Sequence, residues 1–257
     1  MPHPLCGSSV ENTRRAIVNK HIWRESYSEH GFPAFPCPKC RKYTLRLDKD
    51  TLKKRMEPIH DGAYYDRVGA FSGLFRCINA WCGNVVSAAG KIVPGLDYDQ
   101  DGDPIECDYY SIKALVSDVP VIDLPKATPA PVQKPIKAAF SMLWADRGAA
   151  ANKLRISVEC VLDHFQVPKR SRAGGRLTLA RRIELFEDRS EGHLDTFDAL
   201  REVGNTGSHE GDVTFDAIIK SFDIYEDALR DLFSGRKAER AAIVKELKET
   251  RGRGRRR

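Results

Sequence analysis

The sequence lacks any long run of apolar residues. No stretch of its 257 residues approaches the roughly 18 consecutive apolar side chains that a membrane-spanning helix requires. The N-terminal residues also lack the apolar centre of a secretory signal peptide. We therefore expect a cytoplasmic protein that has no membrane partner.

The sequence lacks a net positive charge outside its C-terminal end. The chain carries a net charge of +6, but residues 236–257 alone hold ten Lys/Arg and three Glu, a net +7, which leaves −1 for the first 235 residues. The last residues read RGRGRRR. Such a tail is typical of a flexible arm that contacts phosphate groups, and equally of a solubilising end with no specific partner.

The sequence also lacks the even number of cysteines that a full set of disulfides would need. Seven cysteines in a protein expected to be cytoplasmic argue against a disulfide framework and favour a metal site with unpaired thiols left over. Two close pairs have the spacing of metal ligands: Cys37-x-x-Cys40 and Cys77-x-x-x-x-Cys82. Four thiolates from two short turns match the tetrahedral preference of zinc. Because the protein would fill all four positions, the zinc is expected to be structural.

The residues around these pairs favour short β-strands. Strand-like pieces occupy residues 43–47, 70–76 and 84–89, and the whole arrangement resembles a zinc ribbon. A weak amphipathic pattern over residues 10–28 predicts a helix before the ribbon.

An acidic segment at residues 97–108 partly resembles an EF-hand calcium loop. Asp97, Asp99 and Asp101 stand at the first, third and fifth loop positions, and Asp108 stands at the twelfth. Pro104 stands at the eighth loop position, where a strand-forming hydrophobic residue is expected, and no flanking helices are expected. A solvated acidic turn is therefore favoured over calcium binding.

Proline and helical patterns divide the rest of the chain. Residues 117–135 are rich in proline, which predicts a semi-rigid linker. Apolar residues at helical spacing follow, interrupted by a basic, glycine-bearing loop at residues 168–175. The expected helices span residues 135–146, 149–165, 177–187, 195–203, 214–233 and 236–250.

The segment Leu-Arg-Glu-Val-Gly-Asn-Thr-Gly-Ser-His-Glu at residues 200–210 interrupts this helical region. Gly204 suits a left-handed helix C-cap, and Asn205 tolerates a similar backbone. Ser208 or Asp212 could cap the next helix. These residues predict a corner between two helices. In a purely structural interpretation, His209 only hydrogen-bonds a carboxylate or a carbonyl group at this corner.

A functional interpretation pairs Arg201 with His209. An arginine that offsets phosphate charge and a histidine that titrates near neutral pH suffice for metal-independent RNA cleavage, in which a 2′-hydroxyl attacks the adjacent phosphate. Asn205 and Ser208 would then orient groups or bind phosphate. Arg155 and Glu159, four residues apart on one expected helix, are further supporting candidates.

Residues 135–233 resemble a bacterial domain family of unknown function that occurs alone or attached to restriction and phage-defence proteins. The resemblance rests on Leu154-Arg155 with Glu159, on Leu177-Thr178-Leu179, and on Leu200-Arg201 through Gly204-Asn205 to Ser208-His209. Members often carry a zinc-ribbon-like module before this domain. The family is similar to HEPN helical domains, many of which are dimeric ribonucleases with an Arg…His motif.

The resemblance implies a defence- or toxin-type protein that binds RNA as a homodimer and is a candidate endoribonuclease. One feature departs from the HEPN pattern, because seven residues separate Arg201 from His209 instead of four to six. The alternative is a non-enzymatic protein whose zinc ribbon binds nucleic acid and whose helical bundle mediates dimerisation or recruits a partner. A protein with only a structural role, stabilised by metal, is the third possibility.

The expected fold class is α+β, with a small β zinc ribbon followed by an all-α, HEPN-like bundle. The expected divisions are an N-terminal region at residues 1–115, a linker at 116–135, the bundle at 136–235, and a basic helix with its arginine-rich tail at 236–257.

Overall fold

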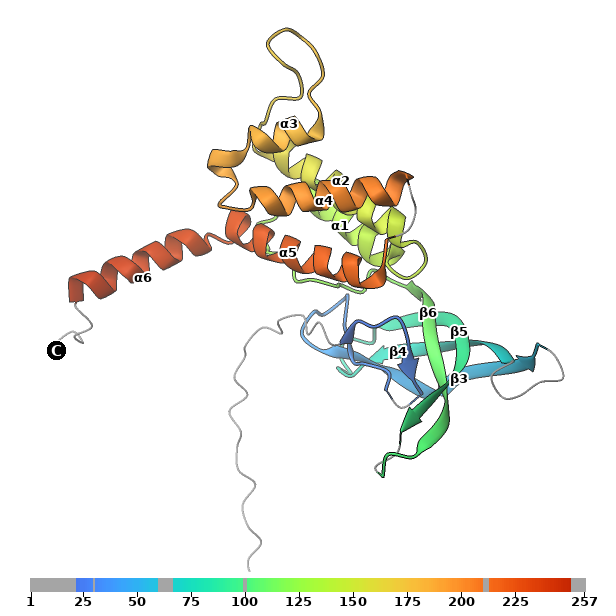
Figure 1. Ribbon diagram of the computed structural model, residues 1–257. Coiled ribbons are helices and arrows are strands. Elements are labelled where there is room, and N and C mark those ends of the chain that lie inside the picture. Colours follow the sequence, from blue (N-terminus) through green and yellow to red (C-terminus); the bar gives the residue numbers. More distant parts are fainter. Residues whose placement is uncertain (1–21, 30, 60–66, 99–100, 210–212, 251–257) are drawn as a thin grey trace, which may run out of the picture.

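The fold is α+β, as the sequence predicts. A computed structural model describes residues 22–29, 31–59, 67–98, 101–209 and 213–250 (Figure 1). Within these residues a six-stranded antiparallel sheet comes first and six α-helices follow. No helix in the described ranges is both long and apolar enough to cross a membrane.

The sheet is built mainly from four long strands that follow one another in the chain. The strand order is β1-β6-β5-β4-β3-β2, so the long strands form a meander, with one very short strand at each edge. Aromatic and branched side chains of one face form its core, among them Phe71, Phe75 and Ile92. The strands are β1 Tyr27–Ser28, β2 Phe35–Pro36, β3 Thr44–Pro58, β4 Arg67–Cys77, β5 Val85–Tyr98 and β6 Pro104–Val116.

One expectation for the N-terminal half is corrected. The expected helix at residues 10–28 lies partly outside the described residues, and its described end is not an α-helix: Tyr27–Ser28 forms β1 and pairs with Tyr109 and Tyr110 of β6. Trp23 is buried against Phe35, with ring centroids 5.3 Å apart. Aromatic packing onto the sheet therefore outweighs the weak helical pattern.

The acidic segment is the tip of the β5–β6 hairpin. Asp97 belongs to β5 and pairs with Ile105, while Pro104 begins β6 opposite Tyr98. An EF-hand needs a helix on each side of its loop, so strands on both sides fit the favoured interpretation of an acidic turn rather than an EF-hand. Asp99 lies outside the described residues.

Six helices form the second part of the described chain. The predicted helices at residues 149–165 and 214–233 are confirmed to within two residues, as are the buried positions Leu154, Ile218 and Phe222. Figure 1 shows α6 extending away from the other helices. The helices are α1 Ala130–Met142, α2 Arg147–His164, α3 Leu179–Glu184, α4 Leu194–His209, α5 Phe215–Phe233 and α6 Arg236–Thr250, with a 3-10 turn, η2, at Glu187–Arg189.

The proline-rich segment differs from the expected semi-rigid linker. Its apolar residues, including Val121 and Ile122, are buried, and the backbone N–H of Asp123 donates to the buried carboxylate of Glu226 at 3.2 Å. Helix α1 already begins at Ala130, and Pro135 lies inside it. Because the alternating apolar residues pack onto the helices, this segment is part of the core.

Trp144 joins the sheet to the helices. Its ring lies 6.1 Å from that of Trp23 and 5.4 Å from that of Phe215, measured between centroids. Arg147 supports the same junction, since its guanidinium group pairs with Glu25 at 2.8 Å and donates to the Val213 carbonyl at 2.8 Å. The sheet and the bundle thus share one continuous core.

A candidate metal centre and a cationic cleft

Four cysteines meet at one end of the sheet. Cys37 and Cys40 lie in the turn between β2 and β3, and Cys77 and Cys82 bracket the turn between β4 and β5. The four sulfur atoms lie within 4.8 Å of one another, with 3.7 Å between Cys37 and Cys82 and 3.7 Å between Cys40 and Cys77. A disulfide needs sulfurs about 2.05 Å apart, so these are free thiols.

The spacing of the sulfurs fits a tetrahedral metal. Zn–S bonds of about 2.3 Å place the sulfurs of a tetrahedral site about 3.8 Å apart. The residues present can therefore hold a metal ion such as zinc, as the sequence predicts. Gly83, with φ of +61°, provides the left-handed turn that directs the chain from Cys82 into β5.

The pKa values of the thiols differ within the cluster. Burial, together with hydrogen bonds to neighbouring thiols, raises the pKa of Cys77 to about 12. Burial also opposes ionisation of Cys40, but backbone N–H groups of Lys42 and Tyr43 outweigh it and lower the pKa of Cys40 to about 7. Four adjacent thiolates repel one another, whereas a bound dication displaces their protons.

The expected corner at residues 200–210 is not formed by its described residues, 200–209. Helix α4 runs without a break from Leu194 to His209, through Gly204, Asn205 and Gly207. The hydroxyl of Ser208 donates to the Gly204 carbonyl at 2.9 Å within that helix, and the next helix is capped by Thr214 instead. The prediction that Gly204 ends the helix and that Ser208 caps the following one is therefore wrong.

The glycines of α4 allow it to approach α2 closely. A Cβ atom at Gly204 would lie 2.5 Å from Cβ of Arg155, and one at Gly207 would lie 2.6 Å from the carbonyl oxygen of Gly148. No side chain fits at either position. The glycines that suggested a turn in the sequence are instead required for the close packing of α4 against α2.

Arg201 and His209 lie on the same helix. Eight residues of α-helix correspond to about 12 Å along the axis and about 80° around it. The backbone of His209 ends α4, while its side chain lies outside the described residues. Within one chain, the backbone positions of Arg201 and His209 are therefore not adjacent. A tight corner between two helices would have brought them together.

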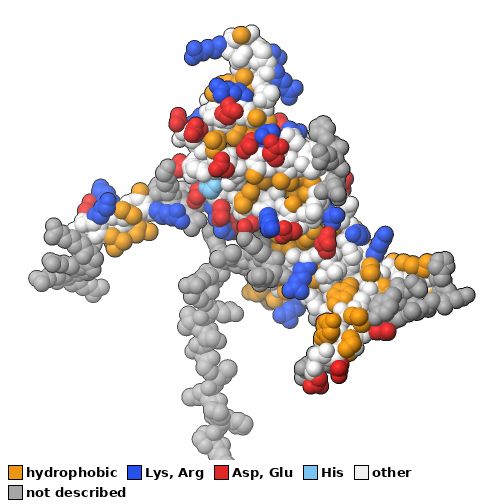
Figure 2. Space-filling view, in the orientation of Figure 1, with side chains coloured by type: hydrophobic (Ala, Val, Ile, Leu, Met, Phe, Trp, Pro, Cys, Tyr) orange, Lys and Arg blue, Asp and Glu red, His pale blue; other side chains and the backbone are white. Residues whose placement is uncertain are grey.

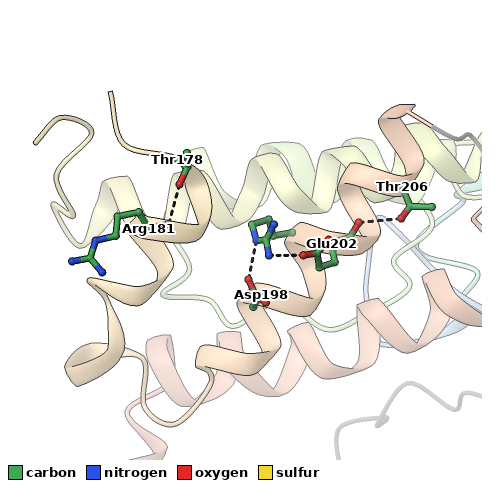
Figure 3. Close-up of polar contacts among 6 residues, drawn as sticks. Thr178, Arg181, Asp198, Glu202 and Thr206 are labelled. Atoms are coloured by element: carbon green, nitrogen blue, oxygen red, sulfur yellow. Dashed lines mark hydrogen bonds and ion pairs between the residues drawn. The ribbon is translucent and has the colours of Figure 1, made fainter. Parts of the chain in front are cut away.

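Two carboxylates already bind Arg201. Its Nε donates to Asp198 at 2.8 Å and its Nη2 to Glu202 at 2.6 Å, and both carboxylates belong to α4 (Figure 3). Hydrogen bonding to Asp198 raises the pKa of Arg201, partly opposed by burial. A guanidinium group with two acidic partners attracts a phosphate less strongly than a free one.

A cleft of about 370 Å³ lies between α2, α3 and the segment that joins them. Arg155 and Glu159, which carry part of the family resemblance, form an ion pair of 3.0 Å in its wall. Thr178, the N-cap of α3, is also in the wall. Figure 3 shows this cap contact between Thr178 and Arg181. The lining residues are Arg155, Glu159, Lys169, Arg176, Leu177, Thr178, Leu179 and Arg182.

Arg182 is the buried cation of this cleft. Its side chain is 6% exposed, and its Nη2 donates to Asp163 at 2.7 Å and to the Val167 carbonyl at 3.1 Å. Its Nε is buried without a hydrogen-bond partner in the described structure. Asp163 also pairs with Lys169 at 2.7 Å. Four cations line the cleft, and Glu159 and Asp163 neutralise only two of them.

A basic loop, residues 168–177, projects beside the cleft. An antiparallel bridge between Arg170 and Arg176 and a hydrogen bond of 2.9 Å from Leu177 N to the Lys169 carbonyl close the loop at its base. Figure 1 shows the loop extending beyond α3, and Figure 2 shows Lys and Arg side chains there. The loop contains four cations and no acidic residue. The sequence predicts its composition but not its position beside the cleft.

Two family models match the chain. Residues 137–250 match a family described as a domain of unknown function, DUF4145, and residues 25–112 match a second one, DUF8608. The first match covers most of the helical part and the second covers most of the sheet. Comparison with curated proteins and with solved structures gave no match. The matches agree with the resemblance to a family of unknown function and name no activity.

Proposed function

We propose that this protein binds RNA through the basic loop and the cationic cleft beside it. The observation that carries the proposal is the concentration of positive charge there, on a body that is otherwise close to neutral. Lys169, Arg170, Arg172 and Arg176 share ten residues of chain with no acidic neighbour. Nucleic-acid affinity arises largely from such cations, because each one that contacts a phosphate releases a condensed counterion.

The cations of the loop are available to a ligand. Arg172 and Arg176 are exposed and form no ion pair with any other described residue, and Arg170 donates only to the Gly174 carbonyl, at 2.9 Å. Their guanidinium groups can therefore bind a phosphate without first breaking an ion pair within the protein. Arg176 and Lys169 of the loop also line the cleft, whose four cations exceed the two carboxylates paired with them. The dielectric constant is lower in the cleft, so a phosphate there is held more strongly.

RNA is preferred over DNA because the helical part resembles a family related to ribonuclease domains. The test is to titrate the full-length protein, by fluorescence anisotropy, into labelled single-stranded RNA, duplex RNA and duplex DNA at several salt concentrations. The proposal is supported if RNA binds and the logarithm of the binding constant falls linearly with the logarithm of the salt concentration. Absence of RNA binding at low salt, or tighter binding to duplex DNA, contradicts it.

The four-cysteine centre has a structural role in this proposal. A zinc ion held by four thiolates has no open position for water or substrate, so its contribution is to fold stability. It would fix the turns at residues 37–40 and 77–82 at one end of the sheet. Loss of the metal is expected to loosen the sheet rather than to stop a reaction.

RNA cleavage by Arg201 and His209 is the second candidate function. The two residues share α4 but start about 12 Å apart along its axis, so one chain does not bring both to the same phosphate directly. An antiparallel pairing of two α4 helices in a homodimer would place Arg201 of each copy near His209 of the other. The paired carboxylates of Arg201 favour binding without cleavage as the first proposal.

A further inference from the structure

The turn between the second pair of cysteines carries a fully exposed tryptophan. The side chain of Trp81 is 97% exposed, whereas the other two tryptophans, Trp23 and Trp144, are 5% and 7% exposed. The backbone beneath Trp81 is fixed, because its N–H donates to the Asn79 side chain at 3.1 Å and the N–H of Cys82 donates to the Asn79 carbonyl at 2.9 Å. A rigid turn therefore presents an indole ring to solvent.

The neighbouring cysteine turn carries positive charge. The first cysteine turn, residues 37–44, contains Lys39, Arg41 and Lys42, and neither this segment nor residues 77–85 contain an acidic side chain. The ammonium group of Lys39 donates to the Cys82 carbonyl at 2.9 Å, which ties the two turns together. With a dication bound, the four thiolates and the metal would carry a charge of −2, and Lys39, Arg41 and Lys42 would bring residues 37–44 and 77–85 to a net +1.

Two further exposed side chains extend the apolar surface. Ile78 is 52% exposed and Tyr43 is 47% exposed. A hydrogen bond of 3.0 Å from Ile78 N to the Thr44 carbonyl holds their segments side by side. An aromatic platform with cations at its edge matches the needs of an unpaired nucleobase, which stacks on the ring while its phosphate is neutralised.

We infer that Trp81 is a stacking platform for an unpaired base, so that the cysteine end of the sheet prefers single-stranded nucleic acid. The inference rests on the proposed nucleic-acid binding but uses a different surface, since the basic loop belongs to the helical part. Bases within a duplex already stack on their neighbours, so Trp81 gains little from a duplex. The basic loop contacts phosphates, which both forms offer.

Trp81 also provides the probe, because it is the one exposed tryptophan. Stacking of a base on an exposed indole quenches its fluorescence. We expect that a single-stranded RNA of about 30 nucleotides quenches the wild-type protein, whereas W81F binds with similar affinity and shows no quenching. W81A should lose roughly 5- to 100-fold in affinity for single strands and almost none for duplex RNA. Y98A removes another exposed ring, 67% exposed at the far hairpin, and serves as the matched control.

The outcomes separate this inference from the proposed function. RNA binding without quenching, with W81A as tight as wild type, overturns the stacking role and leaves binding by the basic loop intact. If the basic loop is neutralised and RNA still quenches the fluorescence with unchanged affinity, the result supports stacking and counts against the loop. A W81A variant that loses duplex and single-strand affinity equally also overturns the inference. Absence of RNA binding to the wild type defeats both proposals.

Discussion

Gly204 of α4 lies directly against Arg155 of α2, with no room between them for even a methyl group. This contact explains two elements of the family resemblance at once. The missing side chain of Gly204 lets the stem of Arg155 cross α4, and the guanidinium group of Arg155 then reaches Glu159 in the wall of the cleft. The glycine motif on α4 therefore shapes the cleft indirectly, through an arginine of the neighbouring helix.

Alanine at Gly204 or Gly207 should destabilise the protein. Alanine normally stabilises a helix by about 1 kcal/mol relative to glycine. Here the added methyl group would overlap Arg155 or the Gly148 backbone, and overpacking costs about 1–3 kcal/mol. We expect G204A and G207A to lower the free energy of unfolding measured with urea. T206A, whose hydroxyl donates only to the Glu202 carbonyl of the same helix, is the control and should be neutral or stabilising. If G207A had a free energy of unfolding equal to or higher than that of the wild type, as is expected of T206A, the close packing would be refuted.

The cysteine cluster should bind one zinc ion per chain. Elemental analysis of the purified protein is expected to give about one zinc, because four thiolates form a closed tetrahedral site. C77S and C82S should each lose the metal and lower the melting temperature. C107S alters a cysteine outside the cluster and should keep both the zinc ion and the wild-type melting temperature. A wild-type protein without metal, or a C82S variant with full zinc content, would count against the site.

Asp163 should stabilise the cleft in a pH-dependent way. Burial favours its protonated form, but hydrogen bonds from Lys169 and Arg182 outweigh burial and hold the pKa of Asp163 below its usual value. A carboxyl group with a lowered pKa stabilises the fold above its unfolded pKa of about 3.9, and this contribution is lost as pH falls through the folded pKa.

D163N should therefore be less stable than wild type at pH 7, by about 1 kcal/mol because the carboxylate is partly exposed. The stabilities of the two proteins should converge as the solution becomes strongly acidic. Urea unfolding at a series of pH values measures this. D188N removes an exposed carboxylate that makes no ion pair with a described residue, and it should show no such dependence. A constant difference between D163N and wild type at all pH values would remove the ion pair from the explanation.

Any RNA cleavage by the bundle should require two chains. R201A and H209A would each be inactive in excess EDTA, but a mixture of the two could form a dimer with one intact Arg201–His209 pair. We expect a 1:1 mixture to regain up to about a quarter of the wild-type cleavage, because about half of the dimers are mixed and each mixed dimer holds one of the two sites. The helical separation prevents one chain from completing the site directly. Activity in H209A alone, or no recovery on mixing, would reject this arrangement.

Much of the fold could be predicted from local patterns. The amphipathic spacing of α2 and α5 and the paired cysteines are strong local signals, because each depends on residues close in sequence. Strand β6 was not predicted, although Tyr110, Ile112 and Leu115 turn inward along it. A shift in register between Ala89 and Gly90 disturbs the regular pairing there, and the acidic tip favoured the interpretation of a loop.

The motif on α4 could not be interpreted correctly from sequence alone. Glycine and asparagine favour a helix end, but glycine also permits a close contact between helices, and only the neighbouring chain decides between these roles. Gly148 and Arg155 provide that neighbour from about fifty residues away. The cleft was missed for the same reason, since Lys169, Arg176 and Arg182 become neighbours of Arg155 only in the folded bundle.

The arginine-rich tail at residues 251–257 lies outside the described residues, and its contribution to binding stays a prediction. Deleting it should weaken binding to all nucleic acids alike and reduce the salt dependence, because its arginines would contact phosphates without reading bases. Unchanged affinity of the truncated protein would assign the tail to solubility alone.

The most direct test of the central claim is the affinity for single-stranded RNA after charge reversal in the basic loop. R170E/R172E should weaken binding at least roughly tenfold and reduce the salt slope by about 0.7 for each phosphate that the loop no longer neutralises. K126E/K134E makes the same change in net charge at two exposed lysines elsewhere and should bind nearly as wild type does. An equal weakening in the two variants, or none in R170E/R172E, would contradict RNA binding by the basic loop.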